Sequence, residues 1–309
     1  MKKKIFIDGR AGTTGLQIEE RLKGRDDVEL ISLPDELRKD ATAREKILNE
    51  ADVVFLCLPD AAAVEAVSMI KNDRTVVIDA STAHRTNPDW AYGFAELGEE
   101  FYENIKNGKR IANPGCHASG FIALVYPLVK SGMLPKEARL TAHSVTGYSG
   151  GGKSMIADYE GEERSALLGA PRQYGLTQMH KHLPEMTKVT GLDSAPVFSP
   201  IVSDFYSGME VTVPLFREQL SYGGIEEIKA LYKEYYHDEI ISYRDESESG
   251  FLSAAALSGK DRMQISVHGN EERIILVARY DNLGKGASGS AVEALNIVLG
   301  CEKTKTLIL

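Results

Sequence analysis

Short apolar runs that alternate with helical patterns most constrain how the first third of this chain can fold. Residues 53–58 read Val-Val-Phe-Leu-Cys-Leu, and residues 75–79 read Thr-Val-Val-Ile-Asp. Such continuous runs, separated by helices, are typical of a parallel sheet that is covered on both faces. We therefore predict an α/β domain over residues 1–115. Its expected strands span 4–8, 28–31, 52–58 and 75–79, and its expected helices span 14–22, 41–49 and 60–71.

The chain changes character after residue 115. Polar and apolar residues alternate in most of the later strand-like segments, and only a few helices, such as 225–236, separate them. This pattern indicates a mixed or antiparallel sheet, and hence an α+β domain over residues 116–285. A last helix within residues 286–309 needs an apolar partner, and we expect it to pack back on the first domain. The expected strands of the second domain span 140–145, 197–202, 210–216, 263–267 and 273–280.

Length, charge and cysteine content exclude several classes of protein. A chain of 309 residues is long enough for about two domains. The net charge of −9 argues against a broad surface for nucleic acid or for an anionic membrane. No apolar run approaches the roughly 18 residues that span a bilayer. Three widely spaced cysteines favour neither a disulfide framework nor a metal site, so we expect a metal-free protein of the cytoplasm.

A glycine-rich turn joins the first expected strand to the first expected helix. Gly9, Gly12 and Gly15 follow the spacing G-x-x-G-x-x-G, with Thr13 and Thr14 before the last glycine. Glycines at this place let the backbone approach a pyrophosphate, which then rests on the helix N-terminus. Because the usual spacing is G-x-G-x-x-G, a plain strand–helix turn is the alternative. The position of the turn favours a Rossmann-type dinucleotide-binding domain.

The segment after the second expected strand offers hydroxyl and basic side chains where an acid usually binds the adenosine ribose. Ser32, with Arg38 and Lys39 further on, suits a ribose 2′-phosphate. We therefore predict NADP in preference to NAD. A solvated helix face is the alternative interpretation of Arg38 and Lys39.

Cys116 follows Asn113-Pro114-Gly115 and precedes an apolar run, residues 121–129, that predicts a helix. A thiol at a helix N-terminus lies among unpaired N–H groups and the positive end of the helix dipole, which favour the thiolate. The same N–H groups can donate to an oxyanion that forms on an attacked carbonyl. A small buried residue at the start of a core helix is the alternative. The Pro-Gly turn favours a nucleophile.

A nucleophilic thiol that follows a nicotinamide-binding domain indicates acyl chemistry, in which hydride moves to or from a thioester or hemithioacetal. Such chemistry needs an acid/base group, and histidine is the usual one. His180 and His182 lie between Tyr174 and Glu185, and in an extended segment both would point the same way. A metal site is the competing interpretation, but no third ligand stands at a regular spacing. We expect His143, within a strand, in the core or behind the site.

Two further segments have the features of anion sites. Residues 147–154, with Ser149 and Lys153, follow a strand and precede a helix, which suits a nest of backbone N–H groups. Ser81 and Arg85 follow the strand 75–79 at the sheet edge where open α/β folds bind ligands. Arg85 is a candidate fork for a carboxylate or phosphate. A surface ion pair is the alternative for Arg85.

These motifs occur together in one order, and the order is more specific than any single motif. They are Gly9-x-x-Gly12-x-x-Gly15, Ser81-x-Ala83-x-Arg85, Asn113-Pro114-Gly115-Cys116, Ser149-Gly150-Gly151-Gly152-Lys153 and His180-Lys181-His182-x-Pro184-Glu185. On these residues the chain resembles the N-acetyl-gamma-glutamyl-phosphate reductase family, in its shorter, second type. The resemblance implies the aspartate-semialdehyde-dehydrogenase-like superfamily and arginine biosynthesis. The implied reaction is NADPH-dependent reduction of N-acetyl-L-glutamyl 5-phosphate to the 5-semialdehyde, with release of phosphate.

The resemblance also implies roles for individual residues. Cys116 would form the thioester, and His180 would be the leading acid/base group. His182 and Glu185 would shape the catalytic site or hold the substrate. The other implied contacts are Ser81, Arg85, Ser149 and Lys153 for substrate or phosphate, Tyr174 near both substrate and nicotinamide, and Asn282 at the nicotinamide amide.

The chain departs from the family pattern at a few positions. His117 and Ser119 stand where the family often has an aromatic residue and a threonine, and Lys153 stands where many relatives have arginine. The same chemistry on aspartyl or aminoadipyl phosphate is one alternative, although the paired histidines argue against the aspartyl substrate. A nucleotide-sensing protein without catalysis is the alternative from a different class. The family implies a homodimer or homotetramer.

Overall fold

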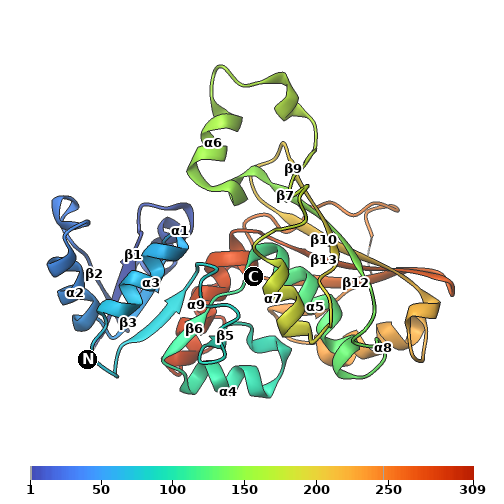
Figure 1. Ribbon diagram of the computed structural model, residues 1–309, viewed down its shortest axis with the longest axis horizontal. Helices are drawn as coiled ribbons and strands as arrows, with labels where there is room; N and C mark the ends of the chain where they lie inside the picture. Colours follow the sequence, from blue (N-terminus) through green and yellow to red (C-terminus); the bar gives the residue numbers. More distant parts are fainter. Residues whose placement is uncertain (1, 246) are drawn as a thin grey trace. The chain divides into compact units, whose positions relative to one another are not determined.

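A computed structural model of the chain describes residues 2–245 and 247–309 and divides them into two compact units (Figure 1). Unit 1 comprises residues 1–114 and 287–307, and unit 2 comprises residues 115–286 and 308–309. The predicted combination of a Rossmann-type parallel sheet and a second, mixed sheet is confirmed. Within the described part of the chain, no helix has both the length and the apolar content that a membrane crossing requires.

Unit 1 contains a six-stranded, wholly parallel sheet in the order β2-β1-β3-β4-β6-β5. The chain leaves β1 to one side for β2 and then crosses to the other side for β3, so the strand order reverses beside β1. Open α/β sheets bind their ligands at such a reversal. The strands are β1 (Lys3–Asp8), β2 (Val28–Ile31), β3 (Val53–Leu56), β4 (Val76–Asp79), β5 (Ala91–Tyr92) and β6 (Arg110–Ala112).

Helices cover both faces of this sheet, as the continuous apolar runs predict. Alternate residues of each strand face opposite sides, so Ile5 contributes to one core cluster and Phe6 to the other. The helices are α1 (Thr13–Leu22), α2 (Ala41–Glu50), α3 (Asp60–Met69), α4 (Glu99–Asn107) and α9 (Gly289–Val298). The end of α3 comes two residues earlier than predicted, because the Asn72 side chain accepts the N–H groups of Arg74 and Thr75 and turns the chain into β4.

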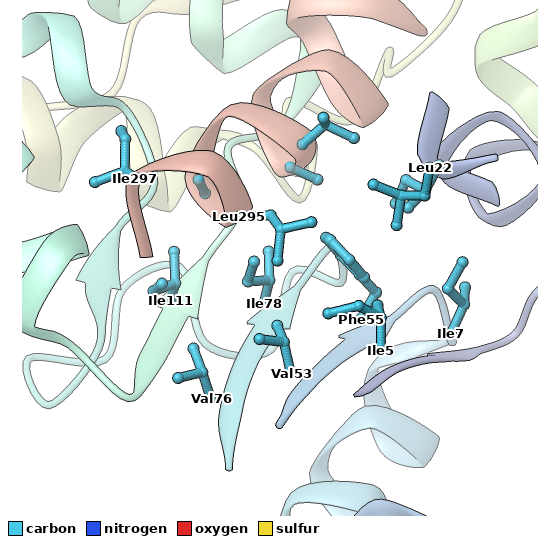
Figure 2. Packing of buried hydrophobic residues seen from close by; sticks show 14 of the residues in the cluster. Ile5, Ile7, Leu22, Val53, Phe55, Val76, Ile78, Ile111, Leu295 and Ile297 are labelled. Carbon is cyan, nitrogen blue, oxygen red and sulfur yellow. The ribbon is translucent and has the colours of Figure 1, made fainter. Parts of the chain in front are cut away.

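Helix α9 comes from the far end of the sequence and completes the core of unit 1. Figure 2 shows Leu295 and Ile297 of α9 above Phe55, Ile78 and Ile111 of the sheet. The last helix, predicted within residues 286–309, is regular only from Gly289, because residues Gly284–Ser288 form a π-helical turn.

Unit 2 contains a seven-stranded mixed sheet in the order β11-β12-β13-β10-β7-β9-β8. β7 pairs parallel with β9 and β11 with β12, and the other pairs are antiparallel. Its strands are β7 (Thr141–Gly147), β8 (Arg172–Gln173), β9 (Val197–Ser203), β10 (Met209–Phe216), β11 (Ile241–Tyr243), β12 (Met263–Gly269) and β13 (Arg273–Tyr280).

Helix α5 (Cys116–Lys130) is the central helix of unit 2 and is buried along most of its length. It packs on β10 and β13, and α7 and α8 pack against it (Figure 1). Helix α6 projects beyond the ends of β7 and β9. The other helices of unit 2 are α6 (Gly152–Glu160), α7 (Leu183–Thr190) and α8 (Ile225–Tyr235).

Candidate active site

Cys116 is the first residue of α5, and three hydrogen bonds fix the turn that presents it. The N–H of Gly115 donates to Oε2 of Glu185 at 3.1 Å. The hydroxyl of Tyr280 donates to the carbonyl of Cys116 at 2.5 Å and accepts the N–H of Gly120 at 3.0 Å. Glu185 and Tyr280 are buried, so these bonds are shielded from water. The turn therefore enters the helix in one defined geometry.

The first turn of α5 leaves its N–H groups without a side-chain cap, because the N-cap residue is Gly115. These N–H groups and the positive end of the helix favour a negative charge at Cys116. Gly286 leaves room beside the thiol, since a Cβ atom at that position would lie 3.1 Å from Cβ of Cys116. Cys116 is half-buried. The predicted environment for a thiolate and an oxyanion is present.

The two predicted histidines meet, although their segment is not extended. Gln178 has a positive φ of 56°, and His182 lies in helical conformation as the N-cap residue of α7. The condition of an extended segment, under which both histidines would point the same way, is therefore not met. The chain turns instead, and the His182 N–H donates to Nδ1 of His180 at 3.2 Å. The two ring centroids lie 4.7 Å apart, edge to face. In neutral His180 this bond places the ring proton on Nε2.

His117 is a third histidine of this cluster, and the sequence analysis gave it no role. Its ring lies 5.4 Å from that of His180 and 5.6 Å from that of His182. Nδ1 lies 2.7 Å from Oγ of Ser144, and Nε2 lies 2.6 Å from the hydroxyl oxygen of Tyr174. Burial, and secondarily His180, lower the pKa of His117 to about 3. Its place directly after the nucleophile was the signal in the sequence that could have revealed it.

β7 presents Ser144, and not His143, to this cluster. Ser144 is fully buried, whereas His143 is exposed. Successive residues of a strand face opposite sides of the sheet, so only one of the two can point inward. The expectation that His143 lies in the core or behind the site is wrong.

Several N–H groups of the glycine-rich segment after β7 already donate hydrogen bonds to carbonyls of unit 2. The N–H groups of Gly147, Tyr148 and Ser149 donate to the carbonyls of residues 208, 205 and 206. The N–H of Gly152 also donates, to the carbonyl of Ser149, so these four N–H groups of the predicted nest are engaged within unit 2. Lys153, in the first turn of α6, is exposed.

Asn282 holds Ser149 from the other side. Its Nδ2 donates to Oγ of Ser149 at 3.0 Å, and its Oδ1 accepts the N–H of Gly208 at 2.9 Å. Both ends of the Asn282 amide are thus engaged within unit 2. The Ser149 hydroxyl accepts one hydrogen bond and keeps its own proton for a further acceptor.

In unit 1, the glycine-rich turn borders a pocket of about 460 Å³ at the carboxyl ends of β1, β2 and β3. The predicted cofactor residues Gly9, Ser32 and Arg38 line it, together with Lys39 and the acidic pair Asp35 and Glu36. Gly9 has a φ of 85°, and a Cβ atom there would lie 2.2 Å from the carbonyl oxygen of Cys57. The turn also contains the predicted Gly12, Thr13, Thr14 and Gly15, at the start of α1.

The predicted pair Ser81 and Arg85 is buried at the carboxyl end of β4. Asp79 accepts the backbone N–H and the hydroxyl of Ser81, and Nδ1 of His84 lies 2.6 Å from it. Arg85 donates from Nε to the carbonyl of Asn113 and from one Nη to that of Ala80. Arg85 therefore orders the segment before the nucleophile, and the alternative of a surface ion pair is wrong.

Comparison with known proteins agrees with this geometry. Residues 4–105 match the family described as semialdehyde dehydrogenase, NAD binding domain, and residues 116–282 match semialdehyde dehydrogenase, dimerisation domain. The fold is similar to aspartate semialdehyde dehydrogenase II of Vibrio cholerae, with a TM-score of 0.74 at 15% identity over 97% of this chain and 99% of that one.

The sequence is far closer to another group of enzymes. It is 48% identical over 308 residues to the N-acetyl-gamma-glutamyl-phosphate reductase of Rhizobium meliloti (strain 1021). This match covers 97% of this chain and 99% of that protein. It is 47% identical over 313 residues to N-acetyl-gamma-glutamyl-phosphate reductase 2 of Nostoc sp. (strain PCC 7120). This match covers 97% of each chain. The chain therefore belongs to the semialdehyde dehydrogenase family and, within it, to the N-acetyl-gamma-glutamyl-phosphate reductases.

Proposed function

We propose that this protein reduces N-acetyl-L-glutamyl 5-phosphate to N-acetyl-L-glutamate 5-semialdehyde with NADPH, releasing phosphate, as a step of arginine biosynthesis. The observation that carries the proposal is Cys116 at a helix N-terminus whose turn is held by Glu185 and Tyr280, followed directly by His117, whose ring packs with those of His180 and His182. The relatives named above extend this chemistry to the acetylated glutamyl substrate.

The first half-reaction forms a thioester. The Cys116 thiolate attacks the acyl-phosphate carbonyl, and the new oxyanion is stabilised by N–H groups of the first turn of α5. Collapse of the tetrahedral species breaks the carbon–oxygen bond to the phosphoryl group, and inorganic phosphate leaves. Glu185 and Tyr280 act by holding this turn in place.

The second half-reaction releases the aldehyde. NADPH, when bound, supplies a hydride to the thioester carbon. The resulting hemithioacetal oxyanion collapses, the carbon–sulfur bond breaks, and the thiolate of Cys116 is restored. His180 donates a hydrogen bond from Nε2–H to the oxygen on which charge develops, and His182 orients His180 through its backbone N–H. His117 is neutral because its pKa is about 3, so the acid/base role falls on the other two histidines.

The pocket of unit 1 fits the adenosine end of NADP. The turn at Gly9 has no room for a side chain, which suits close approach by a pyrophosphate. Ser32, Arg38 and Lys39 are positioned to hold a ribose 2′-phosphate, although Asp35 lies 3.4 Å from Nε of Arg38 and competes for it.

For the substrate we propose contacts from Ser149, Lys153 and Tyr174. The Ser149 hydroxyl proton and the Lys153 ammonium suit the phosphate. Asn282 then acts by orienting Ser149. Arg85 keeps Asn113 ordered, and we propose that Ser81 shapes the same segment. We further propose a homo-oligomer that works in the cytoplasm.

The test is the reverse reaction, phosphate-dependent reduction of NADP⁺, run in parallel with three aldehydes. We expect turnover with N-acetylglutamate semialdehyde, and a kcat/KM at least about a hundredfold lower with aspartate semialdehyde and with aminoadipate semialdehyde. A preference for either of the other aldehydes would keep the thioester chemistry and overturn the substrate. Failure with all three, alongside normal NADP⁺ binding, would favour a nucleotide-sensing protein.

A further inference from the structure

His117 connects the second sheet to Tyr174 through a chain of three hydrogen-bonded side chains. Its Nδ1 lies 2.7 Å from Oγ of Ser144 on β7, and its Nε2 lies 2.6 Å from the hydroxyl oxygen of Tyr174. Ser144 is fully buried and His117 is 3% exposed. The ring of Phe198 packs edge-on against His117 at 5.3 Å and fixes its orientation. The reaction described above assigns no role to Ser144 or His117, and it gives Tyr174 only a contact with the substrate.

The protonation state of His117 limits which of the three side chains, Ser144, His117 and Tyr174, can donate a hydrogen bond to the next. Burial keeps the imidazole neutral, with a pKa of about 3. A neutral imidazole has one N–H donor and one acceptor nitrogen, whereas each hydroxyl group can both donate and accept. One of the two hydroxyl groups therefore donates to His117, and the other accepts from it.

Two directions of hydrogen-bond donation along Ser144, His117 and Tyr174 satisfy this requirement. In the first, Tyr174 donates to Nε2 of His117, so its hydroxyl proton is engaged in that hydrogen bond. In the second, Ser144 donates to Nδ1 and the Nε2–H donates to the Tyr174 oxygen. Only the second direction leaves the Tyr174 hydroxyl proton available to a group other than His117. Burial raises the pKa of Tyr174 above its ordinary value, so the hydroxyl keeps this proton at neutral pH.

We infer that the acceptor of the Tyr174 proton is the nucleophile, although the ring of His180 also lies 6.0 Å from that of Tyr174. His117 directly follows Cys116 in the first turn of α5, which holds Tyr174 at the helix end that presents the thiol. Burial, and secondarily a negative charge on Cys116, raise the pKa of Tyr174. Tyr280 also lies close, but its hydroxyl proton already donates to the Cys116 carbonyl. The remaining titratable groups around this turn are His180, His182 and Glu185.

We propose that His117 is a positioning residue that directs the Tyr174 hydroxyl proton toward the sulfur of Cys116. It does so by donating from Nε2 to the Tyr174 oxygen, and Ser144 sets this direction by donating to Nδ1. Tyr174 then stabilises the thiolate both before attack on the acyl phosphate and after release of the aldehyde. The inference rests on the proposed function, in which this thiolate is the nucleophile.

The test measures the thiolate without any substrate. The rate of alkylation of Cys116 by iodoacetamide is followed against pH, on the Cys116 peptide by mass spectrometry, because only the thiolate reacts. Loss of a hydrogen bond to a charged group disfavours the charged form, so the midpoint of the profile should rise by about one to two pH units in His117→Phe. Tyr174→Phe should give a similar rise.

The double variant separates a linked pair from two independent effects. Because His117 acts through Tyr174, His117→Phe combined with Tyr174→Phe should raise the midpoint no further than the larger single change. His117→Gln keeps an N–H donor near the position of Nε2 and should recover at least half of the shift. His237→Phe, at an exposed histidine of unit 2, is the matched control and should leave the midpoint unchanged.

Kinetics provide a second readout. In His117→Phe, we expect kcat to fall by about ten- to a hundredfold. If His117→Phe does not fold, Ser144→Ala gives the same test, with a smaller upward shift expected.

Three results would overturn the inference. These are an unchanged midpoint in His117→Phe, an unchanged midpoint in the Ser144→Ala substitute, and shifts of His117→Phe and Tyr174→Phe that add in the double variant. The alkylation profile needs no acyl phosphate. A wild-type protein that fails to turn over N-acetylglutamate semialdehyde would therefore overturn the proposed function, whereas these midpoints decide the role of His117 separately.

Discussion

At the scale of single residues, position and not residue type sets the environment of each thiol. Cys57 follows β3, where burial and the charges of Asp79 and Asp8 raise its pKa to about 12. Cys116 begins a helix whose N-cap has no side chain. The same side chain is inert in the first setting and favours the thiolate in the second.

Replacement of the nucleophile should therefore remove the chemistry and leave the cofactor site intact. We expect Cys116→Ala to lower kcat by at least about a thousandfold, since no thioester can form. NADPH should bind as in the wild type, measured by fluorescence titration. Cys301→Ser is the matched control and should keep activity. Wild-type turnover in Cys116→Ala would contradict the thioester route.

The buried, neutral state of His117 should make the fold sensitive to acid. Its pKa is about 3 in the folded protein, against 6.5 for an unperturbed histidine, so only the unfolded chain binds this proton between those values. The free energy of unfolding should then fall as the pH falls from 6.5 toward 3, by up to about 1.4 kcal/mol per pH unit from this group. The stabilisation is complete above pH 6.5.

Urea unfolding at several pH values, in the wild type and in His117→Gln, measures this effect. The variant lacks the titrating group, so the advantage of the wild type should be largest near neutral pH and should shrink toward pH 4. A difference that is constant across this range would show that His117 does not titrate in this way.

At the scale of elements, helix α5 contains a break that another helix repairs. Pro127 lies inside α5 and has no N–H to donate to the carbonyl of Ala123. The Tyr236 hydroxyl, just after α8, donates to that carbonyl at 2.7 Å, and the Tyr232 hydroxyl donates to the carbonyl of Leu124. Tyr236 thus satisfies the one carbonyl that the proline leaves without a helical donor, and Tyr232 of α8 gives the Leu124 carbonyl a further donor.

Loss of this repair should destabilise unit 2. In Tyr236→Phe the carbonyl of Ala123 stays buried without its donor, which should lower the free energy of unfolding by about 1–3 kcal/mol. Tyr222→Phe is the matched control, because it removes a similar bond to the carbonyl of Ser131 at an exposed position. We expect the control to change stability by less than about 0.5 kcal/mol. Equal losses in chemical denaturation would contradict the repair.

At the scale of the whole molecule, unit 1 combines elements from the beginning and from the end of the sequence. The chain enters unit 2 at residue 115 and leaves it after residue 286. Cys116 and Gly286, next to these two points, lie side by side within unit 2. Helix α9 then supplies core residues to unit 1, whose other elements precede residue 115. The integrity of unit 1 therefore depends on the last part of the sequence.

A core substitution in α9 tests this dependence. Leu295 is fully buried against the sheet of unit 1, so Leu295→Ala should lower stability by about 2–5 kcal/mol. Because the cavity lies in unit 1, the thermal transition that Leu295→Ala lowers should be one that NADP⁺ raises. Leu16→Ala, at a leucine that is 48% exposed, is the control and should cost little. A lowered transition that does not respond to NADP⁺ would contradict this assignment.

The local pattern of the chain was sufficient to predict most of the elements and part of the site. Periodicity predicted the parallel and mixed sheets, because each face of a strand or helix must be either apolar or polar. The place of the glycine-rich turn predicted the pocket of unit 1, and the Pro-Gly-Cys turn predicted a thiol at a helix start. These features depend on residues that are neighbours in sequence.

Only the tertiary structure decided which distant side chains meet. The chain of Ser144, His117 and Tyr174, the clamp of Glu185 on Gly115, and the engagement of Asn282 with Ser149 join residues that are far apart in sequence. No periodicity encodes such pairs. They follow from strand register and from helix packing, which also placed His143 outside and brought His180 and His182 together through a turn. The sequence by itself determined the chemistry that is present, and the packing of the elements decided how that chemistry is arranged.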